Sequence, residues 1–340
     1  VHLDGVQFGP FVEPRGVSPN PKISLVRKGV ALCRREGLDF VLAVGGGSVI
    51  DSAKAIAMGA ATGRDPWEFA STGTRPDKTL PVATVLTLAA SGSETSNSCV
   101  LTNEETKEKR GITSETNRPV ISFLDPENTF TVSKFQTGCG IVDIMMHTLE
   151  RYLTPEGGES DLTDRIAEGL LIATRDAGRR AIADPRDYEA RATLMWAGSV
   201  SHNDYTGCGR KRLFPVHKLE HELSAFRDEI AHGAGLSVLF PAWAEHEMQY
   251  DYPRFAQFAN RVLGVEMDFE HPERTAREGI RTLRRFFEEI GMPTHLSQLG
   301  IKPENYEKLA ANTVRTVNGP VKSYSPLDEK ALIEIYGVVG

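Results

Sequence analysis

A short apolar run that ends in glycines and continues into a helical pattern is the feature that most constrains the fold of this chain. Residues 40–44 form a continuous apolar run, which is typical of a parallel strand buried on both faces. Glycines occupy positions 45–47, and the segment SVIDSAKAIAMGA then has a helical pattern whose Ser48 and Asp51 form an S-x-x-D capping pair. Strand, glycine turn and helix in this order predict an α/β sheet with parallel strands.

The same turn predicts a ligand. Glycines leave the backbone open to a phosphate, and the following helix directs its unpaired N–H groups and its positive dipole end toward the turn. A nucleotide pyrophosphate fits such a site. The turn is not the G-x-G-x-x-G fingerprint, so on this segment alone an ordinary strand-to-helix turn is an equally good interpretation.

A second turn, rich in hydroxyl groups, follows the next expected strand at residues 80–86. Its sequence, TLAASGSET, contains Thr87, Ser91 and Ser93. Ligands of an open α/β sheet bind at the carboxyl ends of its strands, so this turn is a second candidate for cofactor contact. Plain turn chemistry is the alternative interpretation.

The first part of the chain contains further elements of mixed type. Asn20 and the proline after it predict the start of a helix that ends at Gly37, and residues 62–78 read as a polar loop. Strands are expected at residues 99–101 and 120–124, with a polar connection over residues 103–117.

From residue 127 onward the strand patterns end and helical patterns follow one another. We therefore expect two domains, an α/β domain over residues 1–126 and an all-helical domain over residues 127–340, with a cleft between them. Candidate helices of the second domain cover residues 134–152, 162–183, 188–202, 216–226, 235–249, 253–263, 272–290, 303–313 and 327–336.

Composition narrows the class of ligand. The formal net charge of -7 and the absence of a long basic run argue against binding to nucleic acid or to an anionic membrane. No apolar stretch of about 18 residues and no secretory signal are found in the sequence, so we expect a cytoplasmic protein with a small-molecule substrate.

Histidines are concentrated in residues 214–235, FPVHKLEHELSAFRDEIAHGAG, which contain three of the nine in the chain. Upstream, Asp143 and His147 stand four residues apart in an apolar helical pattern, so both side chains project from one face. Together with His217 and His232 they offer three nitrogens and one oxygen, a set that iron(II), zinc, nickel or cobalt accepts. The alternative for each residue is an ordinary surface or core histidine.

One rival interpretation of this segment is a zinc hydrolase. Residues 217–221 spell H-x-x-E-H, the inverted zinc-protease signature, in which both histidines bind zinc and Glu220 activates water. That motif leaves Asp143, His147 and the glycine turn without a role.

Four segments resemble the iron-containing (group III) alcohol dehydrogenases, and most nearly their butanol dehydrogenase branch: VGGGSVIDSAK, TLAASGSE, GCGIVDIMMHTLERYL, and HKLEHELSAF followed by AHGAGLSVLFPAW. Four motifs in the right order are far more specific than any one of them. The resemblance implies a dehydroquinate synthase-like fold, with an α/β N-terminal Rossmann-like nucleotide-binding domain and an all-α C-terminal metal-binding domain. It also implies that the chain begins after the first strand-helix unit of the family.

The resemblance further implies NAD(P)-dependent oxidation of a primary alcohol, or reduction of an aldehyde, by an enzyme that is a homodimer or a larger homo-oligomer. It leaves NAD versus NADP open. By their place in the motifs, Asp143, His147, His217 and His232 match the family's metal ligands, for iron(II) usually and zinc in some members, and His221 matches a histidine near the nicotinamide with a role in proton transfer. The matched cofactor-binding positions are Gly45, Gly46, Gly47, Ser48, Asp51, Thr87, Ser91, Ser93 and Lys109.

Two departures from the butanol branch precede the matched histidines. Residues 212–216 read RLFPV where an Asp-Trp pair is usual, and residues 227–231 are one residue longer than usual before His232. The alternatives to an alcohol dehydrogenase are a polyol (glycerol-type) dehydrogenase or a cyclase-type synthase of the same superfamily, a zinc hydrolase, and a protein that binds nucleotide without turnover.

Overall fold

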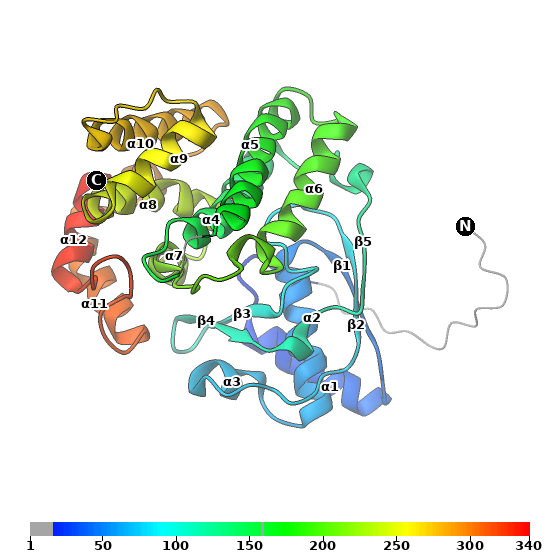
Figure 1. Cartoon of the computed structure of the whole chain (residues 1–340). Helices are drawn as coiled ribbons and strands as arrows, with labels where there is room; N and C mark the ends of the chain where they lie inside the picture. Colours follow the sequence, from blue (N-terminus) through cyan, green and yellow to red (C-terminus); the bar gives the residue numbers. More distant parts are fainter. Residues whose placement is uncertain (1–15, 158–159) are drawn as a thin grey trace.

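The computed structural model describes residues 16–157 and 160–340, and Figure 1 gives the order of their elements. The first part of the chain mixes strands with three helices, α1 (Ile23–Glu36), α2 (Gly47–Thr62) and α3 (Pro66–Thr72). Its strands are β1 (Val41–Gly45), β2 (Val82–Leu86), β3 (Ser98–Asn103), β4 (Glu108–Thr113) and β5 (Ile121–Phe123).

The second part of the chain is helical throughout its described residues. This confirms the predicted fold class, an α/β domain followed by an all-helical domain. The helices are α4 (Lys134–Tyr152), α5 (Asp161–Ala183), α6 (Tyr188–His202), α7 (Pro215–Phe226), α8 (His232–Glu247), α9 (Tyr252–Leu263), α10 (Pro272–Glu289), α11 (Tyr306–Thr316) and α12 (Glu329–Val338).

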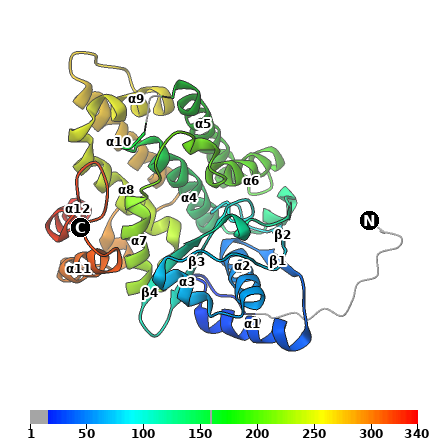
Figure 2. The ribbon, with the colours of Figure 1, turned by 60° about the horizontal axis from the view of Figure 1, so that its bottom comes forward.

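Two small sheets build the α/β domain. Strands β1, β2 and β5 form a parallel sheet in the order β1-β2-β5, and α2 packs on it through a core that includes Ala43, Ile50 and Val82. Strands β3 and β4 form an antiparallel hairpin that contacts α3 and also α7 of the helical domain (Figure 2). The hairpin therefore links the two domains.

One face of the parallel sheet is exposed in the described part of the chain. Ala43 is 1% exposed beneath α2, whereas its neighbours Leu42 and Val44 are 56% and 58% exposed. Ile121 and Phe123 on β5 are 50% and 53% exposed. The prediction that residues 40–44 are buried on both faces is therefore wrong, because α2 covers one face and no described helix covers the other.

Two elements lie in segments that the sequence predicts to be loops. Strand β4 lies in the expected polar connection; Lys109 and Ile112 are buried in it, whereas Gly111 and Thr113 are exposed. Helix α3 lies in the expected loop at residues 62–78, where the side chain of Asp65 accepts a hydrogen bond from the backbone N–H of Trp67 and caps the helix.

The expected helix caps are also wrong in two places. Asn20 has a φ of +57° and does not cap α1; its amide donates to the backbone oxygen of Asp228, 3.2 Å away in the helical domain. Helix α2 begins at Gly47 with Gly46 as its N-cap, and the carboxylate of Asp51 accepts hydrogen bonds from elsewhere in the domain. Long-range contacts thus replace the expected local ones.

Helix α4 lies at the centre of the helical domain. Every residue from Thr137 to Tyr152 is buried, and α5, α6 and α8 pack around the helix. The polar side chains on α4, such as Asp143 and His147, are consequently held in the interior rather than in solvent. Among the described helices, none is both long and apolar enough to cross a lipid bilayer.

Two glycines allow the elements around α4 to approach closely. A Cβ atom at Gly140 on α4 would lie 2.2 Å from the carbonyl oxygen of Ala89 in the α/β domain. A Cβ atom at Gly233 on α8 would lie 2.2 Å from the carbonyl oxygen of Cys139 on α4. Since a backbone oxygen cannot move aside alone, these positions fix the distance between the domains and between α4 and α8.

We expect Gly140→Ala to destabilise the protein, because the new methyl group must push α4 away from the loop after β2. Overpacking of this kind costs about 1–3 kcal/mol, measured as the free energy of unfolding in urea. Gly169→Ala is the matched control, because Gly169 lies on the exposed face of α5 with no neighbouring atom within 4 Å of the added Cβ. There the change stabilises the helix by about 0.5–1 kcal/mol. A Gly140→Ala variant as stable as the control would contradict this account.

Candidate active site

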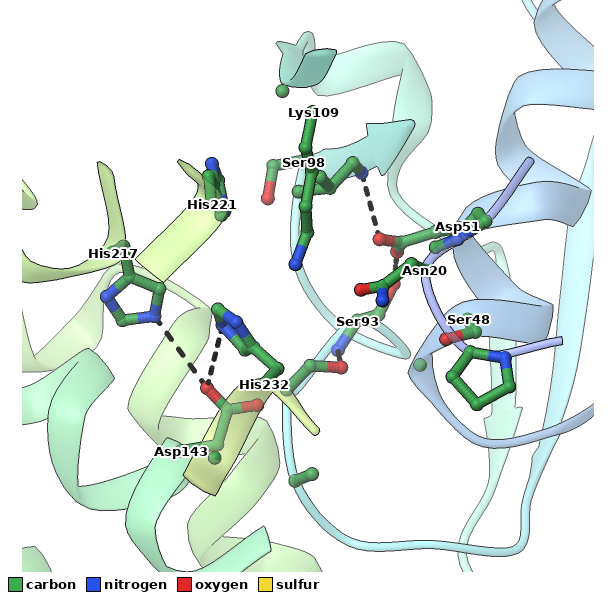
Figure 3. A pocket seen from close by; sticks show the side chains of 18 of the residues that line it. Asn20, Ser48, Asp51, Ser93, Ser98, Lys109, Asp143, His217, His221 and His232 are labelled. Atoms are coloured by element: carbon green, nitrogen blue, oxygen red, sulfur yellow. Dashed lines mark hydrogen bonds and ion pairs between the residues drawn. The ribbon is translucent and has the colours of Figure 1, made fainter. Parts of the chain in front are cut away.

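A cavity of about 1390 Å³ opens between the two domains. The α/β domain contributes the glycine turn at the start of α2, the hydroxyl-rich loop after β2 and the β3–β4 hairpin. The helical domain contributes residues of α4, α7 and α8, and Figure 3 shows side chains from both domains facing this space. The cleft expected between the domains is therefore present.

Four side chains from three helices converge at the helical side of the cavity. Asp143 and His147 lie one turn apart on α4, and Nδ1 of His147 is 3.3 Å from Oδ1 of Asp143. The same oxygen is 3.7 Å from Nε2 of His217 on α7 and 3.8 Å from Nε2 of His232 at the start of α8 (Figure 3). We call these four residues the ligand set. Sequence analysis names all four, and the structure brings them together.

Two buried carboxylates orient the histidines of α7 and α8. Nδ1 of His217 is hydrogen-bonded to Glu150, whose other oxygen accepts from the backbone N–H of Val216 at 2.7 Å. Nδ1 of His232 is hydrogen-bonded to Glu220. Because a carboxylate accepts the hydrogen of Nδ1, each ring directs Nε2 at Asp143. Histidines that bind metals are held by carboxylates in this way.

The charge of His217 depends on the carboxylates of Glu150 and Asp143. Burial alone would lower its pKa, but Glu150 and Asp143 outweigh burial and raise the pKa of His217 to about 9. Burial and the neighbouring histidines lower the pKa of His147 well below its usual value, so that ring is neutral. A cation that binds here must displace the proton of His217, and its affinity therefore falls as the pH is lowered.

Three atoms of the ligand set have no hydrogen-bond partner among the described residues. They are Oδ1 of Asp143, Nδ1 of His147 and Nε2 of His217, and all three are buried. A buried polar atom without a partner costs about 1–3 kcal/mol, so a group of them that face one another requires compensation. A divalent cation supplies it, and three nitrogens with one oxygen suit borderline ions such as iron(II) and zinc. The residues present therefore fit a metal ion.

The glycine turn lies at the opposite side of the cavity. Gly46 is the N-cap of α2 and Gly47 its first residue, and both line the cavity with Ser48 and Ser91. A Cβ atom at Gly47 would lie 2.4 Å from Oγ of Ser91, so the two loops pack closely only because this residue is glycine. The backbone N–H groups at the start of α2 are thus available to an anion such as a pyrophosphate.

Gly45 and Thr87 lie behind this wall. The described residues that line the cavity include neither of them. Gly45 ends β1 and packs against Val49, where an added Cβ would lie 2.5 Å from a methyl carbon. The backbone N–H of Thr87 donates to the carbonyl oxygen of Gly45 at 3.1 Å. These two residues shape the turn and do not face the cavity.

Asp51 has a structural role that sequence analysis did not identify. Its carboxylate accepts from Oγ of Ser93 at 2.5 Å and from the backbone N–H of Val100 at 2.9 Å. Burial raises the pKa of Asp51, against the opposing effect of Lys54. Asp51 thereby ties α2 to the hydroxyl-rich loop and to β3, and still contributes to the cavity wall.

Lys54 lies behind the cavity wall and supports it, and this residue was not predicted from the sequence. It is 0% exposed, and burial lowers its pKa. Its position three residues after Asp51, in an otherwise apolar helix, was the available signal. Nζ of Lys54 donates to three carbonyl oxygens of the loop, those of Ser93 at 2.6 Å, Ser96 at 3.0 Å and Ser98 at 2.8 Å.

Glu220 is occupied and does not act as the base of a hydrolase. Its carboxylate is fully buried and is bonded to His232, to Oγ of Ser224 and, at 3.4 Å, to Nζ of Lys109. Although burial opposes it, the charges of His232 and Lys109 hold the pKa of Glu220 well below its usual range. His221 lines the cavity next to His232, with ring centroids 5.8 Å apart, and forms with Glu220 and His232 a second group of possible metal-binding atoms beside that of Asp143, His147 and His217.

Two further residues near the ligand set were not found from the sequence. Glu150 lies on the same face of α4 as Asp143 and His147, seven and three residues after them, and this spacing was a usable signal. His202, the last residue of α6, lines the cavity and its ring centroid is 4.0 Å from that of His147. No pattern in the sequence singles out His202.

Comparisons with known proteins agree with this arrangement. The family model for the iron-containing alcohol dehydrogenases matches residues 10–126, and the model for the C-terminal part of the Fe-containing alcohol dehydrogenase family matches residues 137–339. The chain is 40% identical over 327 residues to NADH-dependent butanol dehydrogenase A of Clostridium acetobutylicum. The aligned residues are 96% of this chain and 83% of that protein.

Two other relatives extend the comparison. NADPH-dependent aldehyde reductase YqhD of Escherichia coli is 34% identical over 302 residues, which are 88% of this chain and 77% of that protein. The crystal structure of NADH-dependent butanol dehydrogenase A from Thermotoga maritima superposes with a TM-score of 0.92 at 36% identity, over 97% of this chain and 83% of that one.

The fold and the cavity define a two-domain oxidoreductase that combines a nucleotide cofactor with a metal ion. The chain belongs to the iron-containing alcohol dehydrogenase family, in its butanol dehydrogenase-like branch. Its activity is accordingly that of an NAD(P)-linked alcohol dehydrogenase or aldehyde reductase.

We expect Glu150→Gln to weaken metal binding by about 10–100-fold, because the amide no longer fixes the tautomer and orientation of His217. The zinc affinity is measured by calorimetry while the metal-free protein is titrated with zinc. Glu245→Gln on α8 is the control, since Glu245 forms an ion pair with Arg284 and is not among the residues that line the cavity. Equal zinc affinity of the two variants would show that Glu150 does not orient the ligand.

Proposed function

We propose that this chain is a metal-dependent, NAD(P)-linked dehydrogenase of primary alcohols and reductase of aldehydes, with Asp143, His147, His217 and His232 as the ligands of iron(II). The observation that carries this proposal is a group of buried polar atoms that have no partner in the described part of the chain. They face one another in a cavity whose other side is a glycine turn at a helix N-terminus. We further propose that residues 1–126 bind the nucleotide and that residues 127–340 bind the ion.

In this proposal the ion is a Lewis acid that stabilises negative charge on the oxygen of the alcohol or aldehyde, while the nicotinamide accepts or supplies the hydride. Glu150 and Glu220 keep the lone pairs of His217 and His232 directed at one point. The backbone of Gly46 and Gly47 binds the pyrophosphate at the start of α2. The reacting atoms would lie in the cavity that residues of both domains line.

We assign proton transfer to His221. It stands one turn after His217 on α7 and lines the cavity beside His232, and it is not in the group that Asp143, His147 and His217 form but in the one that Glu220 and His232 form with it. In that position it accepts the proton that an alcohol releases on oxidation and returns a proton when an aldehyde is reduced.

We propose NADH as the preferred cofactor and iron(II) as the preferred ion. The relatives with 40% identity are named NADH-dependent butanol dehydrogenases, whereas the relative at 34% is named an NADPH-dependent reductase. A polyol substrate is the second candidate, because the 1,3-propanediol dehydrogenase of Klebsiella pneumoniae is 30% identical to this chain. Homodimeric or larger assembly and a cytoplasmic location stay predictions.

We expect the purified protein to oxidise NADH when butanal is added, and to lose at least nine tenths of this activity after chelation. The measurement is the absorbance of NADH at fixed butanal, before chelation, after it and after iron(II) is restored. NADPH in place of NADH tests the cofactor, and 1,3-propanediol with the oxidised cofactor tests the polyol alternative. Full activity after complete removal of metal would refute a metal-dependent mechanism.

We expect His221→Ala to lower kcat by about 10²–10⁴-fold while the content of bound metal stays unchanged, because general acid-base catalysis contributes that much and the ligand set is intact. The two measurements are turnover of butanal and metal content by atomic absorption. His295→Ala, in the helical domain away from the cavity lining, is the control. Loss of metal in His221→Ala would mean that His221 is a ligand.

A further inference from the structure

One part of the cavity wall beside the ligand set is polar. His202 ends α6, and its ring lies edge-on to that of His147 with centroids 4.0 Å apart. Nε2 of His202 is 3.0 Å from Oγ of Ser98, and both residues line the cavity. Nδ1 of His202 is buried and has no hydrogen-bond partner among the described residues. The pair of Ser98 and His202 thus makes this part of the wall polar.

An arginine adds a positive charge to the same cavity. Arg212 lines it, and its Nη1 donates to Oδ1 of Asp204 at 2.7 Å. The side chain of Arg212 is 37% exposed, so the rest of its guanidinium is accessible. Arg212 lies two residues before Phe214, and their Cα atoms are therefore within about 7 Å of each other.

The position of Phe214 indicates that Arg212 lies near the end of the cavity that contains His147 and His217. Its ring centroid is 5.1 Å from that of His217 and 6.0 Å from that of His147. The glycine turn, where a pyrophosphate would bind, belongs to the other domain. Arg212 is consequently placed to meet the substrate rather than the phosphates of the cofactor.

The carboxylate that holds Arg212 is shared by other arginines. Asp204 also accepts from Nη2 of Arg118 at 3.0 Å, and Nη2 of Arg151 is 3.8 Å away. Arg118 is paired with a second carboxylate, Glu115, at 2.8 Å. Three guanidiniums thus share two carboxylates, and the cluster has a surplus of positive charge.

Arg151 strengthens the positive potential of this cluster, because its charge is shielded from water. It is 0% exposed, and its Nε and Nη2 atoms have no hydrogen-bond partner among the described residues. Its guanidinium carbon lies 4.8 Å from the ring centroid of Phe214. Charges in a low-dielectric interior interact more strongly than charges in water, so this wall attracts an anion.

We propose that the substrate is an aldehyde, or the corresponding alcohol, that carries a carboxylate or a similar anionic group, with Arg212 as the residue that binds that group. The bonded pair of Ser98 and His202 makes the neighbouring wall of the cavity polar. The inference rests on the proposed function and specifies its substrate class. In the reductive direction NAD(P)H gives a hydride to the aldehyde carbon and a proton is added to the oxygen, which yields a hydroxy acid and NAD(P)⁺.

The test compares 4-oxobutanoate with butanal, which have equal chain length and differ in the terminal carboxylate. We expect kcat/KM for 4-oxobutanoate to exceed that for butanal at least tenfold in the wild-type protein. Raising the salt concentration should reduce this ratio, because ions screen an accessible guanidinium. A wild-type ratio near one, or a preference for butanal, would overturn the proposal.

Variants of Arg212 test the residue itself. Arg212→Leu should lower the ratio of the two kcat/KM values at least tenfold, and Arg212→Lys, which keeps the charge, should retain part of the preference. Arg277→Leu, at an exposed position of α10, is the matched control and should leave the ratio unchanged. Circular dichroism establishes that each variant is folded. An unchanged ratio in Arg212→Leu would overturn the assignment.

Binding of succinate, a dianion that cannot be reduced, separates this inference from the proposed function. Calorimetry should detect succinate binding to the metal-loaded wild-type protein, and at least tenfold weaker binding to Arg212→Leu. If neither aldehyde oxidises NAD(P)H while succinate binding still depends on Arg212, the proposed function fails and the anion site stands. If both aldehydes are reduced and succinate binding does not depend on Arg212, the anion site fails alone.

Discussion

A group of buried polar atoms that have no partner among residues 16–157 and 160–340 is the feature on which the rest of this structure depends. Asp143, His147 and His217 direct unpaired atoms at one another in the interior, where each such atom is destabilising. The surrounding structure holds them there: α4 is buried along most of its length, and Glu150 and Glu220 fix the rings that α7 and α8 contribute. A cation bound there would pair these atoms, so metal binding would stabilise the folded protein.

Close backbone contacts connect this group of atoms with the α/β domain. The start of α8, which carries His232, rests against α4 at Gly233, and α4 rests against the loop after β2 at Gly140. That loop is fixed in turn by Lys54, which donates to its carbonyl oxygens. A rigid path of backbone contacts and one buried lysine therefore connects the ligand set with the turn proposed to bind the pyrophosphate.

Sequence patterns predicted the parts of this site that depend on local spacing, and missed those that depend on distant contacts. Helix α4 has the predicted bounds, since its apolar pattern and the cap Ser133 are local. Strand β4 was missed because its burial is set by α7 and α3. The caps assigned to Asn20 and Asp51 were wrong for the same reason, because both side chains bond to segments far away in the sequence.

The two proposals concern one helix. Asp143, His147 and Glu150 belong to the ligand-bearing face of α4, and Arg151, the next residue, turns toward Phe214 and Asp204. Nη1 of Arg151 also donates to the carbonyl oxygen of His147 at the same turn of the helix. The groups proposed to hold the ion and the buried charge proposed to favour an anionic substrate therefore belong to one helix.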